Sequence, residues 1–499
     1  MAVPAFAEGT DEQGVLKVGM EANYAPFNWS QTNDENGAYP IENSDGEYAN
    51  GYDAYIAQKI ADGLGMELQI IKTEWDGLAP GILSGKIDLI IAGMSPTAER
   101  KEQIDFTDKY YTSDLVVVVK KDSPYVEAKS IDDFQGAKIT GQLNTFHYTV
   151  IDDMEGVEKA TAMQDFPAMI SATLAGKIDG YISERPGAMA AAASNEQLTF
   201  VAFEGDQGFD TSEEDTSIAV GLRKDSPLTE EINEILAGIT DEERNQIMLD
   251  MVELNTQGEI QGFWQSTKGI LDEFGPLFLK GAVNTMIIAI LSTLIGFLIG
   301  IIVAIIRNVK TNRDKHFGKW LFYKILDIIL VIYVEIFRGT PMMIQSLLIY
   351  YGGKLFLGLD MSAMTAALFI VSINTGAYLS EVVRGGINSI DGGQLEACKA
   401  IGMTHSQSMK YVILPQAIKN ILPTIGNEFV INIKDTSVLN VISVTELFFI
   451  SRSVAGSTYL IFQSYFIAGL IYFLLTFVTT RILLAYEKRS GKKGHVLTS

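Results

Sequence analysis

The almost uninterrupted apolar stretch from Phe278 to Ile306 constrains the fold of this chain more than any other feature. At about 1.5 Å per residue, a helix of this length exceeds the roughly 30 Å of hydrocarbon in a bilayer. The sequence therefore predicts a membrane-spanning helix. Four further candidate spans bring the expected number to about five: Leu321–Gly352, broken near Gly339-Thr340-Pro341, then Ser362–Val383, the weak and polar Ile418–Leu447, and Tyr459–Leu484.

Charged residues are distributed unevenly along the chain. Residues 1–260 contain 17 Lys and Arg against 48 Asp and Glu, whereas residues 261–499 contain 21 against 13. The acidic half is therefore expected to be a soluble body, and the second half has the short basic loops of a membrane domain. No basic stripe appears in the soluble half, which argues against nucleic acid as a partner. Cys398 is the only cysteine, so an intrachain disulfide is excluded, and no metal site is expected.

Two basic segments predict the orientation in the membrane. Six Lys and Arg residues lie between Arg307 and Lys324, and four more follow Leu484. Positive loops stay in the cytoplasm, and five spans would place both segments there, with the acidic half outside. Ala5-Phe6-Ala7 resembles the cleavage site of a secretory signal, most of which we expect to have been trimmed. The sequence thus predicts a multi-pass cell-membrane protein with an extracellular N-terminal half and a cytoplasmic C-terminus.

Short β-type runs alternate with amphipathic helical stretches in the acidic half, as in Val15–Gly19 and Tyr52–Leu64. This rhythm is typical of βα units and parallel sheets. The β-branched run Val116–Val119 suits a strand that is buried on both faces. A second βα series starts near Lys138, so two α/β lobes are expected. In contrast, Ser30–Asn50 has little apolar content and predicts an irregular loop or insertion.

The predicted fold is a two-lobed α/β domain followed by an all-α membrane domain with about five transmembrane helices. Five parts are expected along the chain: a signal remnant at residues 1–11, the α/β domain at 12–255, a linker at 256–276, the membrane domain at 277–487 and a cytoplasmic tail at 488–499.

The segment from Ala92 to Arg100 has the composition of a cradle for a small carboxylate. A strand runs into a turn of small residues with a hydroxyl, and an arginine follows. The planar guanidinium can hold a carboxylate with two parallel hydrogen bonds. A free amino acid would also need an anion for its ammonium group and an aromatic or apolar wall. Taken by itself, such an arginine can equally be a solvated surface charge.

The first half contains a series of motifs: Tyr24-Ala25-Pro26-Phe27, Gly51-Tyr52-Asp53, Trp75-Asp76-Gly77-Leu78, Ser84-Gly85-Lys86-Ile87-Asp88, the Ser95–Arg100 turn, and Asp105-Phe106-Thr107-Asp108-Lys109-Tyr110-Tyr111. In their order and spacing these motifs resemble the extracellular solute-binding proteins for polar amino acids over about residues 12–255. The resemblance implies a two-lobed, periplasmic-binding-protein-like fold.

The resemblance implies roles for individual residues. Arg100 would bind the α-carboxylate, with help from Ser95 and the backbone of Gly93. Trp75 would pack on the ligand. Thr145 would be a further carboxylate donor, although Asn144 stands before it where the family usually has Gly. The acid that holds the α-ammonium is usually Asp, and Glu184 occupies the matching position here.

The side-chain specificity is predicted from Glu21, Tyr24 and Trp75. Glu21 lies where relatives that hold basic or amide side chains often have Asp, and the two aromatic rings could hold a long cation between them. We therefore expect a basic or amide amino acid, with Arg, Lys, His and Gln as the leading candidates. The alternative is that Glu21 only caps or solvates the end of its strand.

The second half contains a further series of motifs: Phe337-Arg338-Gly339-Thr340-Pro341, Asn374–Glu381, Gly393–Gly402, Val412–Gln416 and Lys434-Asp435-Thr436-Ser437. These motifs resemble the permease subunits of polar amino-acid ATP-binding-cassette importers over about residues 275–487. The family's cytoplasmic coupling loop would then include Glu396, Ala397 and Gly402. Polar residues within spans are costly in lipid, so we expect Glu335, Asn374 and Glu381 to face a translocation path or a neighbouring helix, as we do Glu428 and Asn432.

A nucleotide site is not expected in this chain. Gly81–Ile87 has one residue too few between its glycines for a phosphate loop, and Ile87 stands where Ser or Thr would reach magnesium. The resemblance implies a bacterial transport subunit, without catalytic residues or a cofactor of its own. Its expected partners are an amino acid, the lipid bilayer, a second copy of the chain and two ATPase subunits that hold ATP and Mg²⁺.

Three other classes of protein are less consistent with the sequence. In glutamate-receptor channels the pore interrupts the ligand domain, whereas here both predicted lobes end before Phe278. An enzyme could use Glu21 and Glu184 in acid–base chemistry but would gain nothing from an appended permease. A sensor would need a cytoplasmic signalling domain, for which Glu487–Ser499 is too short.

Overall fold

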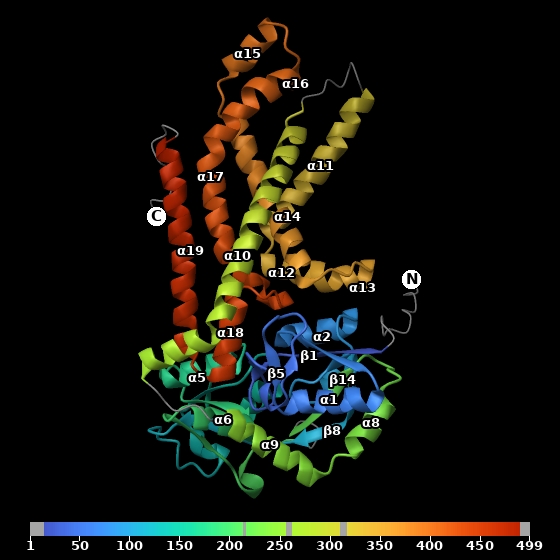
Figure 1. Cartoon of the computed structure of the whole chain (residues 1–499), viewed down its shortest axis with the longest axis vertical. Helices are drawn as coiled ribbons and strands as arrows, with labels where there is room; N and C mark the ends of the chain where they lie inside the picture. Colours follow the sequence, from blue (N-terminus) through green and yellow to red (C-terminus); the bar gives the residue numbers. More distant parts are fainter. Residues whose placement is uncertain (1–13, 213–215, 256–261, 310–316, 490–499) are drawn as a thin grey trace. The chain divides into compact units, whose positions relative to one another are not determined.

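The computed structural model describes residues 14–212, 216–255, 262–309 and 317–489. The chain divides into two compact units (Figure 1). One, the binding unit, comprises residues 1–278 together with 449–468. The other, the helical unit, comprises residues 279–448 and 469–499. The predicted signal remnant at 1–11 lies outside the described residues, as does most of the predicted tail.

The first lobe of the binding unit is built on a five-stranded sheet. Its strands, in spatial order, are β6 (Glu67–Lys72), β1 (Val15–Met20), β7 (Leu89–Ile90), β14 (Ser217–Leu222) and β8 (Asp105–Thr112). β6, β1 and β7 are parallel, and β14 runs antiparallel to both of its neighbours. The helices of this lobe are α1 (Tyr52–Leu64), α2 (Trp75–Ser84), α3 (Ala98–Gln103), α8 (Thr229–Ala237) and α9 (Asp241–Asn255).

The second lobe repeats this arrangement. Its strands, in spatial order, are β11 (Glu158–Lys159), β10 (Lys138–Thr140), β12 (Gly180–Glu184), β9 (Leu115–Lys120) and β13 (Leu198–Val201). Its α-helices are α4 (Phe146–Thr149), α5 (Phe166–Leu174) and α6 (Arg185–Ser194). The Val116–Val119 run is buried on both faces of β9, and the prediction of two α/β lobes is confirmed.

The prediction for residues 30–50 is wrong in part. This segment contributes strands to a small antiparallel sheet: β2 (Asn23–Tyr24), β3 (Asn28–Gln31), β5 (Tyr48–Asn50) and β4 (Tyr39–Pro40). Its order rests on buried polar contacts together with a few apolar side chains, Ile41 and Ala49, that join the main hydrophobic core. Glu47 is buried, and its carboxylate pairs with Lys72 Nζ at 2.8 Å.

The helical unit contains the predicted membrane helices. The described helices from residue 263 onward are α10 (Phe263–Arg307), α11 (Phe317–Gly339), α12 (Met342–Leu347), a π-helical turn (Leu348–Gly352), α13 (Gly353–Leu357), α14 (Ala363–Asn388), α15 (Gly392–Ala400), α16 (His405–Ser408), a second π-helical turn (Met409–Ile413), α17 (Leu414–Asp435), a 3-10 helix (Thr436–Ile442), α18 (Leu447–Thr458) and α19 (Ile461–Arg489). α10 begins at Phe263, so it includes the second part of the predicted linker.

By length and apolar composition, fewer helices qualify as membrane spans than the five predicted. Among the described residues three do, α10, α14 and α19, and a fourth is the bent pair formed by residues 405–442 and 447–458. α11 is long enough, but it carries Lys319, Lys324, Asp327, Glu335 and Arg338.

Small residues allow α10 and α14 to approach closely. A side chain at Gly296 would meet Thr375 at 2.8 Å, and one at Gly300 would meet the backbone of α14 at 2.9 Å. Close approach at small residues is a common way for membrane helices to pack. Beside this contact, Asn432 of α17 donates to Thr293 Oγ1 at 2.8 Å.

Candidate functional site

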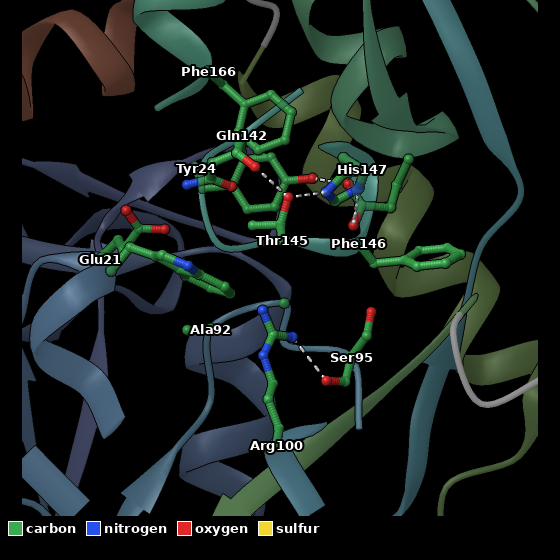
Figure 2. A pocket seen from close by; sticks show the side chains of 13 residues that line it. Glu21, Tyr24, Ala92, Ser95, Arg100, Gln142, Thr145, Phe146, His147 and Phe166 are labelled. Carbon is green, nitrogen blue, oxygen red and sulfur yellow. Dashed lines mark hydrogen bonds and ion pairs between the residues drawn. The ribbon is translucent and has the colours of Figure 1, made fainter. Parts of the chain in front are cut away.

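A small cavity lies between the two lobes of the binding unit (Figure 2). It is lined by Glu21, Tyr24, Trp75, Ala92, Gly93, Ser95, Arg100, Gln142, Thr145, Phe146, His147, Phe166 and Glu184. All eight residues that the sequence predicted to bind substrate are therefore gathered around one space, although they come from five separate stretches of the chain.

Arg100 extends from α3 toward the second lobe. Its Nη1 donates to the carbonyl oxygen of Ser95 at 2.8 Å, and Nη2 donates to that of Asn144 at 3.0 Å. The guanidinium carbon lies 5.1 Å from the centre of the Trp75 ring, within cation–π range. Burial lowers the pKa of Arg100 to about 10, so the group remains cationic at neutral pH. The alternative of a solvated surface charge does not fit these contacts.

The backbone conformation and contacts of Asn144 account for Asn at a position where the family usually has Gly. Its φ is 59°, in the left-handed region that Gly occupies freely and Asn tolerates better than most residues. Its side-chain amide donates to Asp76 Oδ1 of the first lobe at 3.2 Å. The neighbouring Thr145 donates its hydroxyl proton to the carbonyl oxygen of Gln142 at 2.7 Å. Asn144 therefore provides the backbone conformation of glycine and also a contact between the lobes.

Glu184 lies at the end of β12, where it has two protein partners. His147 Nε2 is 2.8 Å from Glu184 Oε1, and the hydroxyl of Tyr24 donates to Oε2. Burial alone would raise the pKa of Glu184, but His147 and Tyr24 stabilise the anion, and the resulting pKa is below its ordinary value. A carboxylate that stays ionised in a closed cavity is suited to hold an ammonium group.

Sequence reasoning missed His147, Gln142, Phe146 and Phe166, whereas Ala92 opens the segment that was predicted as a carboxylate cradle. The ring of Phe166 stacks on Tyr24 with 4.3 Å between centroids, so it forms part of the aromatic wall. His147 follows Thr145 by two residues at the start of α4, and its Nδ1 lies 3.2 Å from Thr145 Oγ1. His147 could have been predicted from its position, because a histidine next to a predicted ligand donor can pair with a nearby acid.

Glu21 follows β1 directly and is only 4% exposed. Its Oε1 is buried and has no hydrogen-bond partner among the residues that the structure describes. Burial, and then the negative charge of Glu74, raises the pKa of Glu21 well above its ordinary value. A side chain that merely solvated the end of the strand would be exposed, so the burial of Glu21 does not fit solvation.

Gly93 has a backbone that favours glycine, with φ at +62°. A Cβ at this position would lie 3.2 Å from the Tyr24 ring. The N–H of Gly93 donates to the hydroxyl of Tyr110 at 3.3 Å, so Tyr110 already takes the donor that was expected to assist Arg100. The structural reason for glycine here is the close approach of Tyr24.

The residues predicted for a translocation path have different surroundings in the helical unit. Glu381 of α14 pairs with Arg307 and Arg384. Asn374 donates to Gln345 Oε1 and to the carbonyl oxygen of Phe337, both at 3.0 Å. Glu335 of α11 is exposed. The structure therefore does not bring the three together by direct contacts.

The predicted coupling loop is a helix, a break and a second short helix. α15 and α16 form the tip of the connection between α14 and α17 (Figure 1). Glu396 and Ala397 are exposed on α15. Gly402 has φ at +83° in the break, and its N–H donates to the carbonyl oxygen of Lys399 at 3.0 Å.

Comparison with known proteins gives a matching family for each half of the chain. Residues 16–250 match the bacterial extracellular solute-binding proteins, family 3, and residues 317–492 match the binding-protein-dependent transport system inner membrane component. The arginine transport system permease protein ArtQ of Bacillus subtilis is 35% identical over 214 residues, which are 43% of this chain and 92% of that protein. The glutamine transport system permease protein GlnP of Escherichia coli is 33% identical over 215 residues, which are 43% of this chain and 93% of that protein.

Among solved structures, the binding half is similar to the amino acid ABC transporter substrate-binding protein AbpA of Streptococcus pneumoniae bound to L-arginine. The two are 25% identical, the alignment covers 49% of this chain and 98% of that one, and the TM-score is 0.42.

Proposed function

This chain belongs to the permeases of binding-protein-dependent amino-acid transport systems and carries a solute-binding domain of family 3 fused to its permease domain, and we propose that it imports a basic or amide amino acid. The binding unit captures the amino acid outside the cell, and the helical unit conducts it across the membrane. ATP hydrolysis by a pair of separate subunits drives the transfer, and two copies of this chain enclose the path.

The buried carboxylate of Glu21 is the observation that carries the proposed specificity. Within the described part of the chain its Oε1 has no hydrogen-bond partner, and Glu21 lines the cavity that Arg100 and Glu184 also line. A basic or amide side chain donates hydrogen bonds to such an oxygen, whereas an apolar side chain would leave it unpaired at a cost of about 1–3 kcal/mol. The relatives named for arginine and glutamine transport fit the same two chemical classes.

In the proposed complex, the guanidinium of Arg100 holds the α-carboxylate. The α-ammonium binds the ionised Glu184, which His147 also contacts. The rings of Tyr24 and Trp75 flank the side chain of the ligand. Arg100 must release at least one of its two backbone carbonyls to receive the ligand. Because those carbonyls belong to Ser95 and to Asn144 in opposite lobes, ligand capture and lobe movement are coupled.

A binding screen of the full-length chain in lipid nanodiscs tests the substrate class. Isothermal titration with each common amino acid should give tight binding for one or more of arginine, lysine, histidine and glutamine. Weak or absent binding is expected for small apolar and acidic amino acids. Tight binding of alanine or glutamate alone would refute the proposed class.

Replacing Arg100 with Ala tests the assignment of the carboxylate site. The affinity should fall at least about a hundredfold, because truncating one partner of a buried charged pair costs about 2–5 kcal/mol. Assembly in the membrane should not change, which size-exclusion chromatography would check. Arg223→Ala is the matched control, since Arg223 pairs at 3.7 Å with Asp88 of its own lobe. Unchanged affinity in Arg100→Ala would show that the carboxylate binds elsewhere.

A further inference from the structure

A segment from the permease half of the sequence belongs to the binding unit in space. Residues 449–468 lie inside the stretch that matches the inner membrane component, yet they pack with the solute-binding domain. We refer to residues 449–468 as the docking segment. It includes most of α18 and the start of α19, and its side chains Ala455, Tyr459 and Ile461 are part of the main hydrophobic core of the binding unit.

The packing of the docking segment is close around residues 456–459. Added at Gly456, a Cβ would lie 2.4 Å from the carbonyl oxygen of Asn23, so the two backbones are nearly in contact. The hydroxyl of Tyr459 donates to the carbonyl oxygen of Ala25 at 2.8 Å. The N–H of Ser30 donates to the hydroxyl of Ser457 at 3.1 Å.

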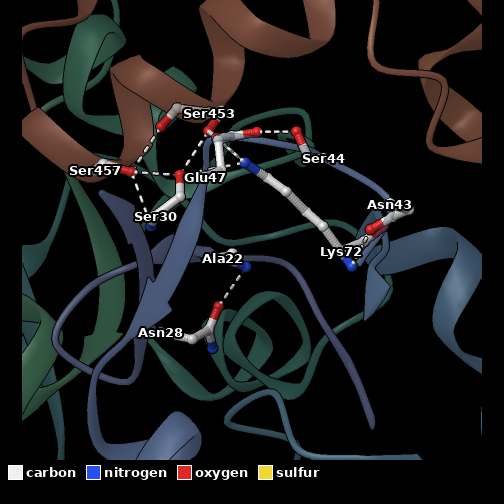
Figure 3. A network of polar contacts seen from close by, with 9 residues as sticks. All are labelled: Ala22, Asn28, Ser30, Asn43, Ser44, Glu47, Lys72, Ser453 and Ser457. Carbon is white, nitrogen blue, oxygen red and sulfur yellow. Dashed lines mark hydrogen bonds and ion pairs between the residues drawn. The ribbon is translucent and has the colours of Figure 1, made fainter. Parts of the chain in front are cut away.

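A buried polar network joins the docking segment to the first lobe (Figure 3). Ser453 donates its hydroxyl proton to Glu47 Oε1 at 2.6 Å, and Lys72 Nζ contacts both groups. Ser30 lies against the hydroxyls of Ser453 and Ser457 in the same network. Buried polar groups of this kind are stable only when each has a partner, so the lobe and the segment complement one another.

Arg452 of the docking segment contacts both lobes at once. Its Nη1 lies 2.7 Å from Glu74 Oε2, and its Nη2 lies 2.7 Å from Asp165 Oδ2. Glu74 precedes α2 in the first lobe, and Asp165 caps the N-terminus of α5 in the second. All three side chains are at most 10% exposed. A single guanidinium can make both contacts only while the two lobes are close together.

We propose that the docking segment recognises the closed form of the binding unit, and that Arg452 senses closure by bridging Glu74 and Asp165. When the lobes separate, Arg452 keeps one acid at most, and the other loses its partner. The segment therefore stabilises closed lobes relative to open ones. By thermodynamic reciprocity, an amino acid that closes the lobes strengthens the docking of this segment, which would report an occupied site to the permease.

The distance between the lobes tests this proposal without any ligand. Spin labels would be placed on the exposed positions Asp62 of α1 and Glu127 of the second lobe, in the full-length Cys398→Ser chain in nanodiscs. Pulsed electron–electron double resonance should show a larger share of long distances between the two labels in Arg452→Gln than in the parent chain. Asp165→Asn should act in the same direction, because Asn can still cap α5 but lacks the charge.

Arg223→Gln is the control, since its ion pair stays within the first lobe. Identical distance distributions in Arg452→Gln, Asp165→Asn and the control would overturn the proposal. The double variant of Arg452→Gln and Asp165→Asn should open the lobes no further than either single change, because both remove the same bridge. If the double variant opened the lobes by the sum of the two single effects, the proposal would also be contradicted.

Amino-acid affinity supplies a second readout, which rests on the proposed function. With L-arginine and L-glutamine as probes, Arg452→Gln should weaken binding about tenfold, and the Arg223→Gln control should not. Binding that is normal in Arg452→Gln would refute the bridge while leaving the amino-acid site intact. If neither probe binds the parent chain, the proposed substrates are wrong, and the interlobe distances still decide the role of Arg452.

Discussion

Glu21 would combine its proposed role in ligand binding with a cost in stability. Its pKa is raised well above its ordinary value by burial and then by Glu74, so between pH 4.5 and the raised folded value the folded chain holds a proton that the unfolded chain has released. Stability is therefore lost as the pH rises from 4.5 through the raised folded value. Glu21→Gln removes this cost, and we expect an unfolding temperature about 2–4 °C higher at pH 7, measured by calorimetry.

The same variant should lose affinity for a cationic ligand. An ammonium or guanidinium favours the ionised Glu21, so binding of L-arginine should weaken as the pH falls and should drop at least about tenfold in Glu21→Gln. Glutamine, which needs only hydrogen bonds, should be affected less. The exposed Glu127→Gln serves as the control for the loss of one charge. Equal loss for both ligands, or none for arginine, would contradict the role of Glu21.

At the residue scale the sequence predicted eight positions around the cavity, and the structure places all eight there. The motifs were sufficient because each one positions a side chain at the end of a strand or the start of a helix. The contacts of those side chains could not be predicted. His147 reaches Glu184 only because α4 and β12, almost forty residues apart, lie side by side in the second lobe, and a motif contains no information on such pairing.

At the scale of single elements, the role of the break between α15 and α16 can be tested by substituting Gly402. The positive φ of Gly402 costs a residue with a Cβ about 1–2 kcal/mol, although the space around it is open. Gly402→Ala should therefore distort the predicted coupling helices and reduce amino-acid-stimulated ATP hydrolysis by the assembled transporter. Amino-acid binding should not change.

Gly392, at the start of α15, provides a matched control. It also has open space around it, but its φ is not in the left-handed region, so Gly392→Ala should be tolerated. Equal hydrolysis rates in the two variants would show that the break at Gly402 is not needed for coupling. Lost amino-acid binding in Gly402→Ala would point to a general folding defect instead.

Elements were predicted well where hydrophobic periodicity decides them and poorly where polar contacts do. The buried strand at Val116–Val119 and the helix at Tyr52–Leu64 follow from their patterns. The strands within residues 30–50 do not, because Glu47 and Lys72 hold this region through a buried ion pair. α18 was missed for a related reason: it contains Arg452 and three serines, and the partners of Arg452 and Ser453 lie more than 280 residues away in the sequence.

At the scale of the whole molecule, the number of spans decides which loops share a side of the membrane. Three spans, α10, α14 and α19, would put α15 on the side opposite the C-terminal basic tail. Five spans, with α11 and α17 added, put α15 on the same side as that tail. They also put α18 on the side of the N-terminal half, as its contacts with both lobes require. The five-span arrangement requires α11 to cross the membrane with its charged residues, and α17 to cross it before the bend that precedes α18.

Labelling of single cysteines distinguishes these topologies. In a Cys398→Ser background, cysteines would replace the exposed residues Asp122 in the second lobe, Leu359 between α13 and α14, and Gln394 on α15. With five spans, a membrane-impermeant maleimide added to intact cells should label positions 122 and 359, and position 394 only after permeabilisation. With three spans, positions 359 and 394 exchange their behaviour. Only the five-span pattern places the predicted coupling loop in the cytoplasm and, at the same time, the docking segment on the extracellular side.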